Sequence, residues 1–105
     1  MKRKVLWAES ALDDLKWQIA FIANDNPPAA HRVRVRIKEA AANLGEMAIG
    51  RPGRVAGTYE RVLSDLPFIL VYVLVPDKSG ESVTILRVIH TSQDWPKEDG
   101  QNAIA

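Results

Sequence analysis

Phe68-Ile-Leu-Val-Tyr-Val-Leu-Val75 is the longest apolar run in the sequence, and it is rich in β-branched and aromatic residues. Turn-forming residues bound it at 64–67 and at 76–80. Such a run is typical of a strand at the centre of a sheet, and it is far shorter than the roughly 20 residues of a membrane-spanning helix. We therefore expect a central strand here, with Val71 and Val73 deeply buried.

Strands are also expected before and after this run. Residues 58–63 and 82–89 carry β-branched and aromatic side chains between turn formers. Because the turns are short, these three strands should be sequential antiparallel neighbours in a meander. Residues 2–7, Lys-Arg-Lys-Val-Leu-Trp, predict a further short strand.

Two segments between the first strand and the meander have apolar residues at helical spacing. The first begins at about Ala8 and ends near Asn24, where the breaker cluster Asn24-Asp25-Asn26-Pro27-Pro28 follows. The second follows the prolines and ends at Gly45, which we expect to form a left-handed C-cap. The order β-α-α-β-β-β predicts an α+β fold with a helical hairpin packed on one face of a mostly antiparallel sheet.

Length and composition are those of one globular domain. The chain has 105 residues, 47% of them apolar, and we expect one domain over residues 1–96 with a flexible tail over 97–105. It has no cysteine, and His31 and His90 are far apart in sequence, so we expect no metal and no cofactor. Glu9 interrupts the first apolar stretch, so we expect no signal peptide, no membrane partner and a cytoplasmic location.

Charge is unevenly distributed although the net charge is only +1. Residues 32–61 carry an excess of four positive charges, contributed by six arginines and Lys38 against three glutamates. A local excess of this kind indicates a polyanion such as nucleic acid, or an acidic protein partner. For the cations of residues 32–38 alone, a solvated helix face is an equally good interpretation.

Three parts of the sequence, taken in order, resemble the RelE/ParE family of toxins over about residues 3–96. The first is the helix with Ala11-Leu-Asp-Asp-Leu15, which leads into Asp25-Asn-Pro27. The second is Gly50-Arg-Pro-Gly-Arg-Val-Ala-Gly-Thr-Tyr-Glu60, followed by Pro67-Phe-Ile-Leu-Val-Tyr72. The third is Ile85-Leu-Arg-Val-Ile-His-Thr-Ser-Gln-Asp-Trp-Pro96. The order and spacing of the segments together identify the family.

The resemblance implies the toxin half of a bacterial type II toxin–antitoxin pair, neutralised by a cognate antitoxin and contacting operator DNA only through that antitoxin. ParE-like members inhibit DNA gyrase, whereas RelE-like members are endonucleases that cut mRNA on the ribosome. The helical hairpin with its Asp-Asn-Pro linker, the low net charge and the lack of a RelE-type lysine cluster favour the ParE-like function. A third hypothesis is a binding module or corepressor that poisons nothing.

The two toxin functions assign different roles to the same side chains. Metal-free RNA cleavage needs proton-transfer groups and phosphate-binding cations. The candidates for this chemistry are His90, Arg61 and Arg87, with Glu60, Arg54 and Tyr72 as further members. In a ParE-like protein no catalytic residue is required, and the expected contacts to gyrase or DNA are Arg51, Arg54, Arg61, Arg87 and His90.

Strand alternation limits which of these side chains can meet. It predicts that Val83, Ile85, Arg87 and Ile89 share one face, while Leu86, Val88 and His90 share the other. Arg87 and His90 should therefore not converge unless a bulge re-aims one of them. By the same rule, Tyr59 and Arg61 should point away from Glu60. Trp95 should anchor the end of the last strand, and an amphipathic antitoxin helix should occupy an apolar groove, with its acidic residues meeting the arginine-rich region.

Overall fold

The computed structural model describes residues 2–48, 50–93, 95 and 96. The tail predicted at residues 97–105 lies outside these residues. The elements are β1 (Val5–Trp7), α1 (Glu9–Asp25), α2 (Pro27–Glu46), β2 (Arg51–Pro52), β3 (Tyr59–Val62), β4 (Phe68–Asp77) and β5 (Gly80–His90). The predicted α+β order is confirmed, with one strand added, because the loop predicted over residues 45–58 contains the short strand β2.

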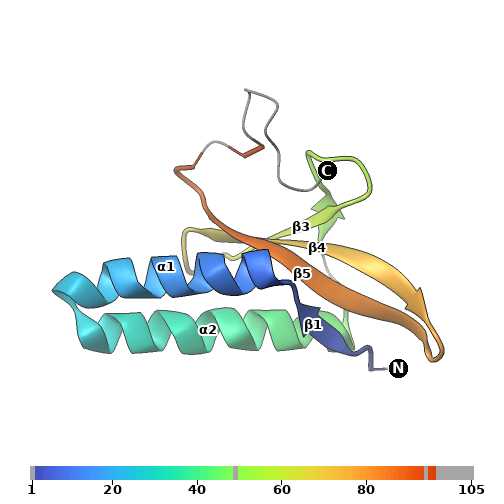
Figure 1. Cartoon of the computed structure of the whole chain (residues 1–105), viewed down its shortest axis with the longest axis horizontal. Coiled ribbons are helices and arrows are strands. Elements are labelled where there is room, and N and C mark those ends of the chain that lie inside the picture. Colours follow the sequence, from blue (N-terminus) through green and yellow to red (C-terminus); the bar gives the residue numbers. More distant parts are fainter. Residues whose placement is uncertain (1, 49, 94, 97–105) are drawn as a thin grey trace.

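The sheet has five strands in the order β1-β5-β4-β3-β2. The strands β3 to β5 form the predicted antiparallel meander, and β2 adds a further antiparallel strand beside β3. At the other edge, β1 joins β5 in parallel with Val5 opposite Val83. The long hairpin α1–α2 covers one face of this sheet (Figure 1). The opposite face carries no helix of the described chain, so loop residues provide its cover.

The sequence supplies a side-chain cap at the start of α2, whereas α1 begins after Ala8 without one. The Asn26 side chain accepts the backbone N–H of Ala29 at 3.1 Å, and Pro27 begins α2. The predicted left-handed cap at Gly45 is wrong, because Gly45 is helical and α2 continues to Glu46. Gly45 instead lets the amino-terminal segment approach, since an added Cβ would lie 2.6 Å from the carbonyl oxygen of Arg3.

The sheet has a hydrophobic cluster on each face. The large cluster lies under the helices and includes Leu15, Ile37, Leu70, Tyr72 and Ile85. The small cluster on the opposite face consists of Ile69, Val71, Ile89 and Trp95, with Val55 packed against it. The central strand is therefore buried on both sides at its first half, and Val71 is fully buried as predicted. The prediction for Val73 is wrong, since it lies farther along β4, where the hairpin extends beyond the helices and burial is partial.

A β-bulge at Leu86 changes the faces of β5. Val71 pairs with Arg87, but the next residue, Tyr72, pairs with Ile85, so Leu86 is an extra residue in the ladder. Strict alternation across this position was therefore a wrong prediction. Val88 joins Ile85 on the helix face, whereas Arg87 lies on the opposite face.

The hairpin β4–β5 is longer than predicted, because both strands extend into the turn segment predicted over residues 76–80. Asp77 pairs with Gly80 across a two-residue turn, and Gly80 has φ +120, which suits a residue without a side chain. Within the described part of the chain, neither helix has the length and apolar character to cross a membrane.

Candidate functional site

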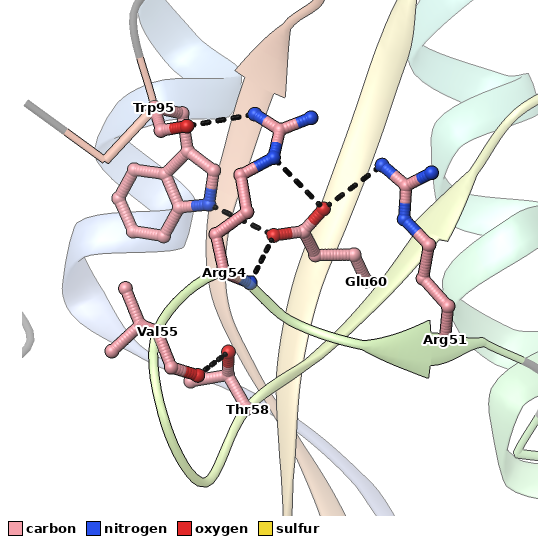
Figure 2. A network of polar contacts seen from close by, with 6 residues as sticks. All are labelled: Arg51, Arg54, Val55, Thr58, Glu60 and Trp95. Carbon is pink, nitrogen blue, oxygen red and sulfur yellow. Dashed lines mark hydrogen bonds and ion pairs between the residues drawn. The ribbon is translucent and has the colours of Figure 1, made fainter.

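A buried carboxylate, that of Glu60, organises the polar contacts on the helix-free face of the sheet (Figure 2). Its side chain is 0% exposed. One oxygen, Oε1, accepts from Arg51 Nη2 at 3.2 Å and lies 3.8 Å from Arg54 Nε. The other, Oε2, accepts the backbone N–H of Arg54 at 2.9 Å and the indole N–H of Trp95 at 3.3 Å. One side chain thus joins β2, the following loop and the segment after β5.

The loop over residues 53–58 has its own hydrogen bonds, which fix the backbone of Arg54. The N–H of Gly53 donates to the carbonyl of Thr58 at 2.7 Å. The hydroxyl of Thr58 donates to the carbonyl of Val55 at 2.7 Å, and Gly57 turns the chain with φ +84. These local bonds explain why the sequence Gly-Arg-Val-Ala-Gly-Thr forms a defined turn beside Glu60.

Glu60 is held in its ionised form. Burial acts to raise the pKa of this carboxyl, but hydrogen bonds from the Arg54 N–H, the Arg51 guanidinium and the Trp95 indole, together with the charge of Arg54, lower it below its ordinary value. A proton-transfer role would require a carboxyl group that reaches the substrate and is poised near neutral pH. Glu60 has neither property, so it is a structural anion within this site.

The two arginines that contact Glu60 keep much of their surface exposed. The side chain of Arg51 is 55% exposed and that of Arg54 is 47% exposed. Arg54 Nη1 also donates to the backbone carbonyl of Trp95 at 2.7 Å. Both guanidinium groups are therefore anchored at one side by Glu60 while the remaining donors are available at the surface.

Arg87 is held mainly by structural contacts. Its Nε and Nη2 donate to the two oxygens of Asp14 at 2.7 and 3.0 Å, and Asp14 also accepts the N–H of Val88 at 2.9 Å. The hydrogen bonds from Arg87 to Asp14 raise the pKa of Arg87. The guanidinium carbon lies 5.6 Å from the ring centroid of Trp95. Arg87 thus connects α1, β5 and the Glu60 cluster, which consists of Arg51, Arg54, Glu60 and Trp95.

Arg61 and His90 lie apart from the Glu60 cluster. Arg61 pairs with Leu70 and His90 with Phe68, and both partners face the helices. The Nδ1 atom of His90 accepts the backbone N–H of Ser92 at 3.1 Å. Because a backbone N–H can only donate, neutral His90 carries its proton on Nε2. Its ring also lies edge-on to Phe68, with 5.3 Å between centroids.

The structure thus brings together only some of the candidate residues. Three arginines gather around Glu60 and Trp95, namely Arg51, Arg54 and Arg87. Arg61 and His90 lie on the face that the helices cover, on β3 and β5, with β4 between them. Glu60 pairs with Val71 and Arg61 with Leu70, so they lie on opposite faces as strand alternation predicts.

Tyr72, a further candidate, is stacked on Tyr59 on the face of the sheet that the helices cover. Burial raises the pKa of its hydroxyl. Asp14 was not among the predicted site residues. Its place on the first helix, one turn after Ser10, gave no sign of a partner on the last strand. Among the described residues, no group of three His, Cys, Asp or Glu side chains has the geometry to hold a metal ion.

The helical hairpin presents a second surface. Trp17 and Phe21, one turn apart on α1, are 78% and 77% exposed. A separate hollow of about 480 Å³ lies between α1 and α2. Its floor is apolar and includes Leu12, Leu15 and Ile19, and its rim carries the cations Lys16, Arg34 and Lys38.

The fold and sequence are similar to those of known toxins. Residues 5–95 match the family described as ParE toxin of the type II toxin–antitoxin system, parDE. A protein of Sinorhizobium fredii named "Putative toxin Y4kP" is 41% identical over 97 residues, which cover 91% of this chain and 96% of that protein.

Solved structures give the same fold. The chromosomal ParDE system of P. aeruginosa has a chain with a TM-score of 0.77 and 23% identity, covering 87% of this chain and 98% of that one. The toxin–antitoxin complex RelBE2 of Mycobacterium tuberculosis has a chain with a TM-score of 0.59 and 26% identity, covering 86% and 99%. The YoeB/ParE toxin of Agrobacterium tumefaciens has a TM-score of 0.56 and 17% identity, covering 83% and 97%.

Proposed function

Since the chain belongs to the ParE toxin family of type II toxin–antitoxin systems, we propose that it inhibits DNA gyrase and that a cognate antitoxin neutralises it. The observation that carries the gyrase assignment is the separation of the residues that a nuclease would need. An inhibitor needs a binding surface, whereas a nuclease must hold proton-transfer groups and phosphate-binding cations within a few ångströms of one another.

The three nuclease candidates do not converge on one point of the sheet. His90 and Arg61 lie on β5 and β3 with β4 between them, a lateral separation of about 10 Å at the usual strand spacing. Arg87 pairs with Val71, whose side chain lies on the helix-free face. Its guanidinium donates two hydrogen bonds to Asp14 of α1. This arrangement supports a protein that binds its target without cutting RNA.

The binding surface that fits this function is the helix-free face around Arg51 and Arg54. Both guanidinium groups project from short, hydrogen-bonded segments and retain unused donors. A planar guanidinium suits carboxylates and phosphates alike, and both are present in a complex of gyrase with DNA. We therefore assign the principal target contacts to these two arginines.

The antitoxin is assigned to the other face, over the helical hairpin. The hollow between α1 and α2 combines an apolar floor with a rim formed by Lys16, Arg34 and Lys38. Trp17 and Phe21 add exposed aromatic surface elsewhere on α1. This combination fits an amphipathic helix whose apolar side chains fill the hollow and whose acidic side chains face the three cations.

The gyrase assignment can be tested with two parallel assays. Purified wild-type chain should inhibit gyrase supercoiling and trap cleaved DNA, while primer extension on messages from induced cells should show no codon-phased cuts. Replacing both Arg51 and Arg54 by Ala should remove the inhibition, and His90→Ala should weaken it only partially. Codon-phased cleavage with normal supercoiling would overturn the proposal, and in that case His90→Ala or Arg61→Ala should lower the rate by about 10²–10⁴-fold.

The antitoxin assignment predicts that a different set of substitutions abolishes antitoxin binding. Reversing the three rim cations to Glu should prevent co-purification with the co-expressed antitoxin, whereas the Arg51 and Arg54 double variant should still co-purify. If the reversal leaves the complex intact and the double variant disrupts it, the two surfaces have been assigned the wrong way round.

A further inference from the structure

We propose that Glu60 is a positioning residue, whose single buried carboxylate presents the guanidinium groups of Arg51 and Arg54 together on the helix-free face. This inference rests on the proposed function, in which these two arginines contact the target. Glu60 itself reaches no target, because its side chain is 0% exposed beneath the arginines and Trp95. It acts through the groups that it holds.

The surroundings of Glu60 require an acceptor with two oxygens. All four polar groups directed at it are N–H donors, from Arg51, from the backbone and side chain of Arg54, and from Trp95. An ionised carboxylate only accepts hydrogen bonds, so it matches this environment. A glutamine would direct its NH₂ group at some of these donors, and those contacts would be lost. Charge and geometry therefore both select a carboxylate.

Without Glu60 the two arginines would have few constraints. Among the described residues, Glu60 is the only side chain within hydrogen-bonding or ion-pair distance of Arg51. Arg54 would retain its bond to the carbonyl of Trp95, but that carbonyl belongs to a segment which Glu60 also anchors through the indole. A guanidinium fixed before binding loses less side-chain entropy when the target arrives. Loss of the carboxylate should thus weaken the arginine pair even though both arginines remain.

The test compares Glu60→Gln with two controls that leave the Glu60 cluster intact. Asp65→Asn makes the same acid-to-amide change at an arginine pair on the helix side, where Arg36 Nε lies 2.7 Å from Asp65. Ile37→Ala lowers stability from the buried core and lies far from the loop in sequence. The measurements are the cellular toxin level that halves the growth rate, gyrase supercoiling, the melting temperature, and hydrogen exchange at the Arg54 amide and the Trp95 indole.

Glu60→Gln should require about a ten- to hundred-fold higher toxin level for the same growth inhibition, as expected when two arginine side chains must be ordered at binding. Exchange at the Arg54 amide and Trp95 indole should become about ten-fold faster or more, because bonds to a charged acceptor are lost. Asp65→Asn should retain full toxicity, and Ile37→Ala should retain far more toxicity than Glu60→Gln at a comparable melting temperature.

Several results would overturn the inference. Glu60→Gln could be as toxic as wild type, could leave both exchange rates unchanged, or could lose no more toxicity than Ile37→Ala at equal stability. If Glu60→Gln does not fold, Trp95→Phe removes one donor and keeps an aromatic ring. Trp95→Phe should then lose less toxicity than is expected for Glu60→Gln, with faster hydrogen exchange at the Arg54 amide. Unchanged toxicity of Trp95→Phe would reject the positioning role. If the wild type spares gyrase but Glu60→Gln still loses toxicity, the gyrase proposal fails and the positioning role stands.

Discussion

The pair Asp14–Arg87 should be a main stabilising contact between the helical hairpin and the last strand. Their side chains are only 17% and 22% exposed, and Asp14 accepts two hydrogen bonds from Arg87 and one from the N–H of Val88. Asp14→Ala leaves a partly buried guanidinium and a backbone N–H without their acceptor. An exposed ion pair contributes about 0–1 kcal/mol and breaking a buried one costs about 3–5 kcal/mol, so we expect a loss near 3 kcal/mol.

Urea denaturation measures this loss. With a slope of about 1.5 kcal/mol per molar, a loss of 3 kcal/mol lowers the urea midpoint by about 2 M. A double-mutant cycle with Arg87→Ala separates the pair from the other contacts of each residue, and its coupling free energy should be about 1–3 kcal/mol. A coupling below about 0.5 kcal/mol would refute the reasoning, because it is no larger than the deviation from additivity of unconnected sites. Arg87 would then be available as a target contact.

Three further predictions concern other parts of the molecule. Because the pKa of Glu60 is lowered from 4.5, its ionised form stabilises the fold at neutral pH, and this stabilisation should disappear as the pH falls from about 5 through the folded pKa. The difference in urea midpoint between wild type and Glu60→Gln should therefore shrink toward pH 3, and a constant difference would contradict the linkage. Gly45→Ala should lower the free energy of unfolding by about 1–3 kcal/mol in the same assay although alanine favours helices, because its Cβ would meet the Arg3 carbonyl. A gain of stability would show that the segment around Arg3 can shift. Replacing Trp17 and Phe21 together by Ser should leave the melting temperature within a few degrees, since both are exposed, but should weaken co-purification with the antitoxin.

Local sequence signals predicted most of the elements. The breaker cluster before Pro27 separates the two helices, and the apolar run from Phe68 is the central strand. Contacts between distant residues were not predictable in this way. Strand alternation cannot reveal the bulge at Leu86, because the extra residue is defined by its pairing with β4. Gly45 matches a helix-cap signal, but the close approach of Arg3 gives it another reason to be glycine.

In the candidate site, too, the residue types were predictable from the sequence but their contacts were not. The sequence indicated the cationic side chains but could not pair them. Arg87 is paired with Asp14, 73 positions away, and one of the donors to Glu60 is Trp95, 35 positions away. The sequence likewise offered Glu60 as a proton-transfer group, and only the four donors around it identify it as a fixed anion. The spacing of charges in the sequence is therefore weaker evidence for a role than the contacts made once the sheet has formed.

The parallel pairing of β1 with β5 affects the order of events during synthesis on the ribosome. Val5 pairs with Val83, so the first strand has no partner until the last strand has been translated and has left the exit tunnel. Until then α1 and α2 have no completed sheet beneath them, and the growing chain should remain sensitive to protease. Stalled nascent chains of increasing length should become resistant only when β5 is outside the tunnel, and earlier resistance would contradict this order. The sheet would thus be completed only after β5 has left the ribosome.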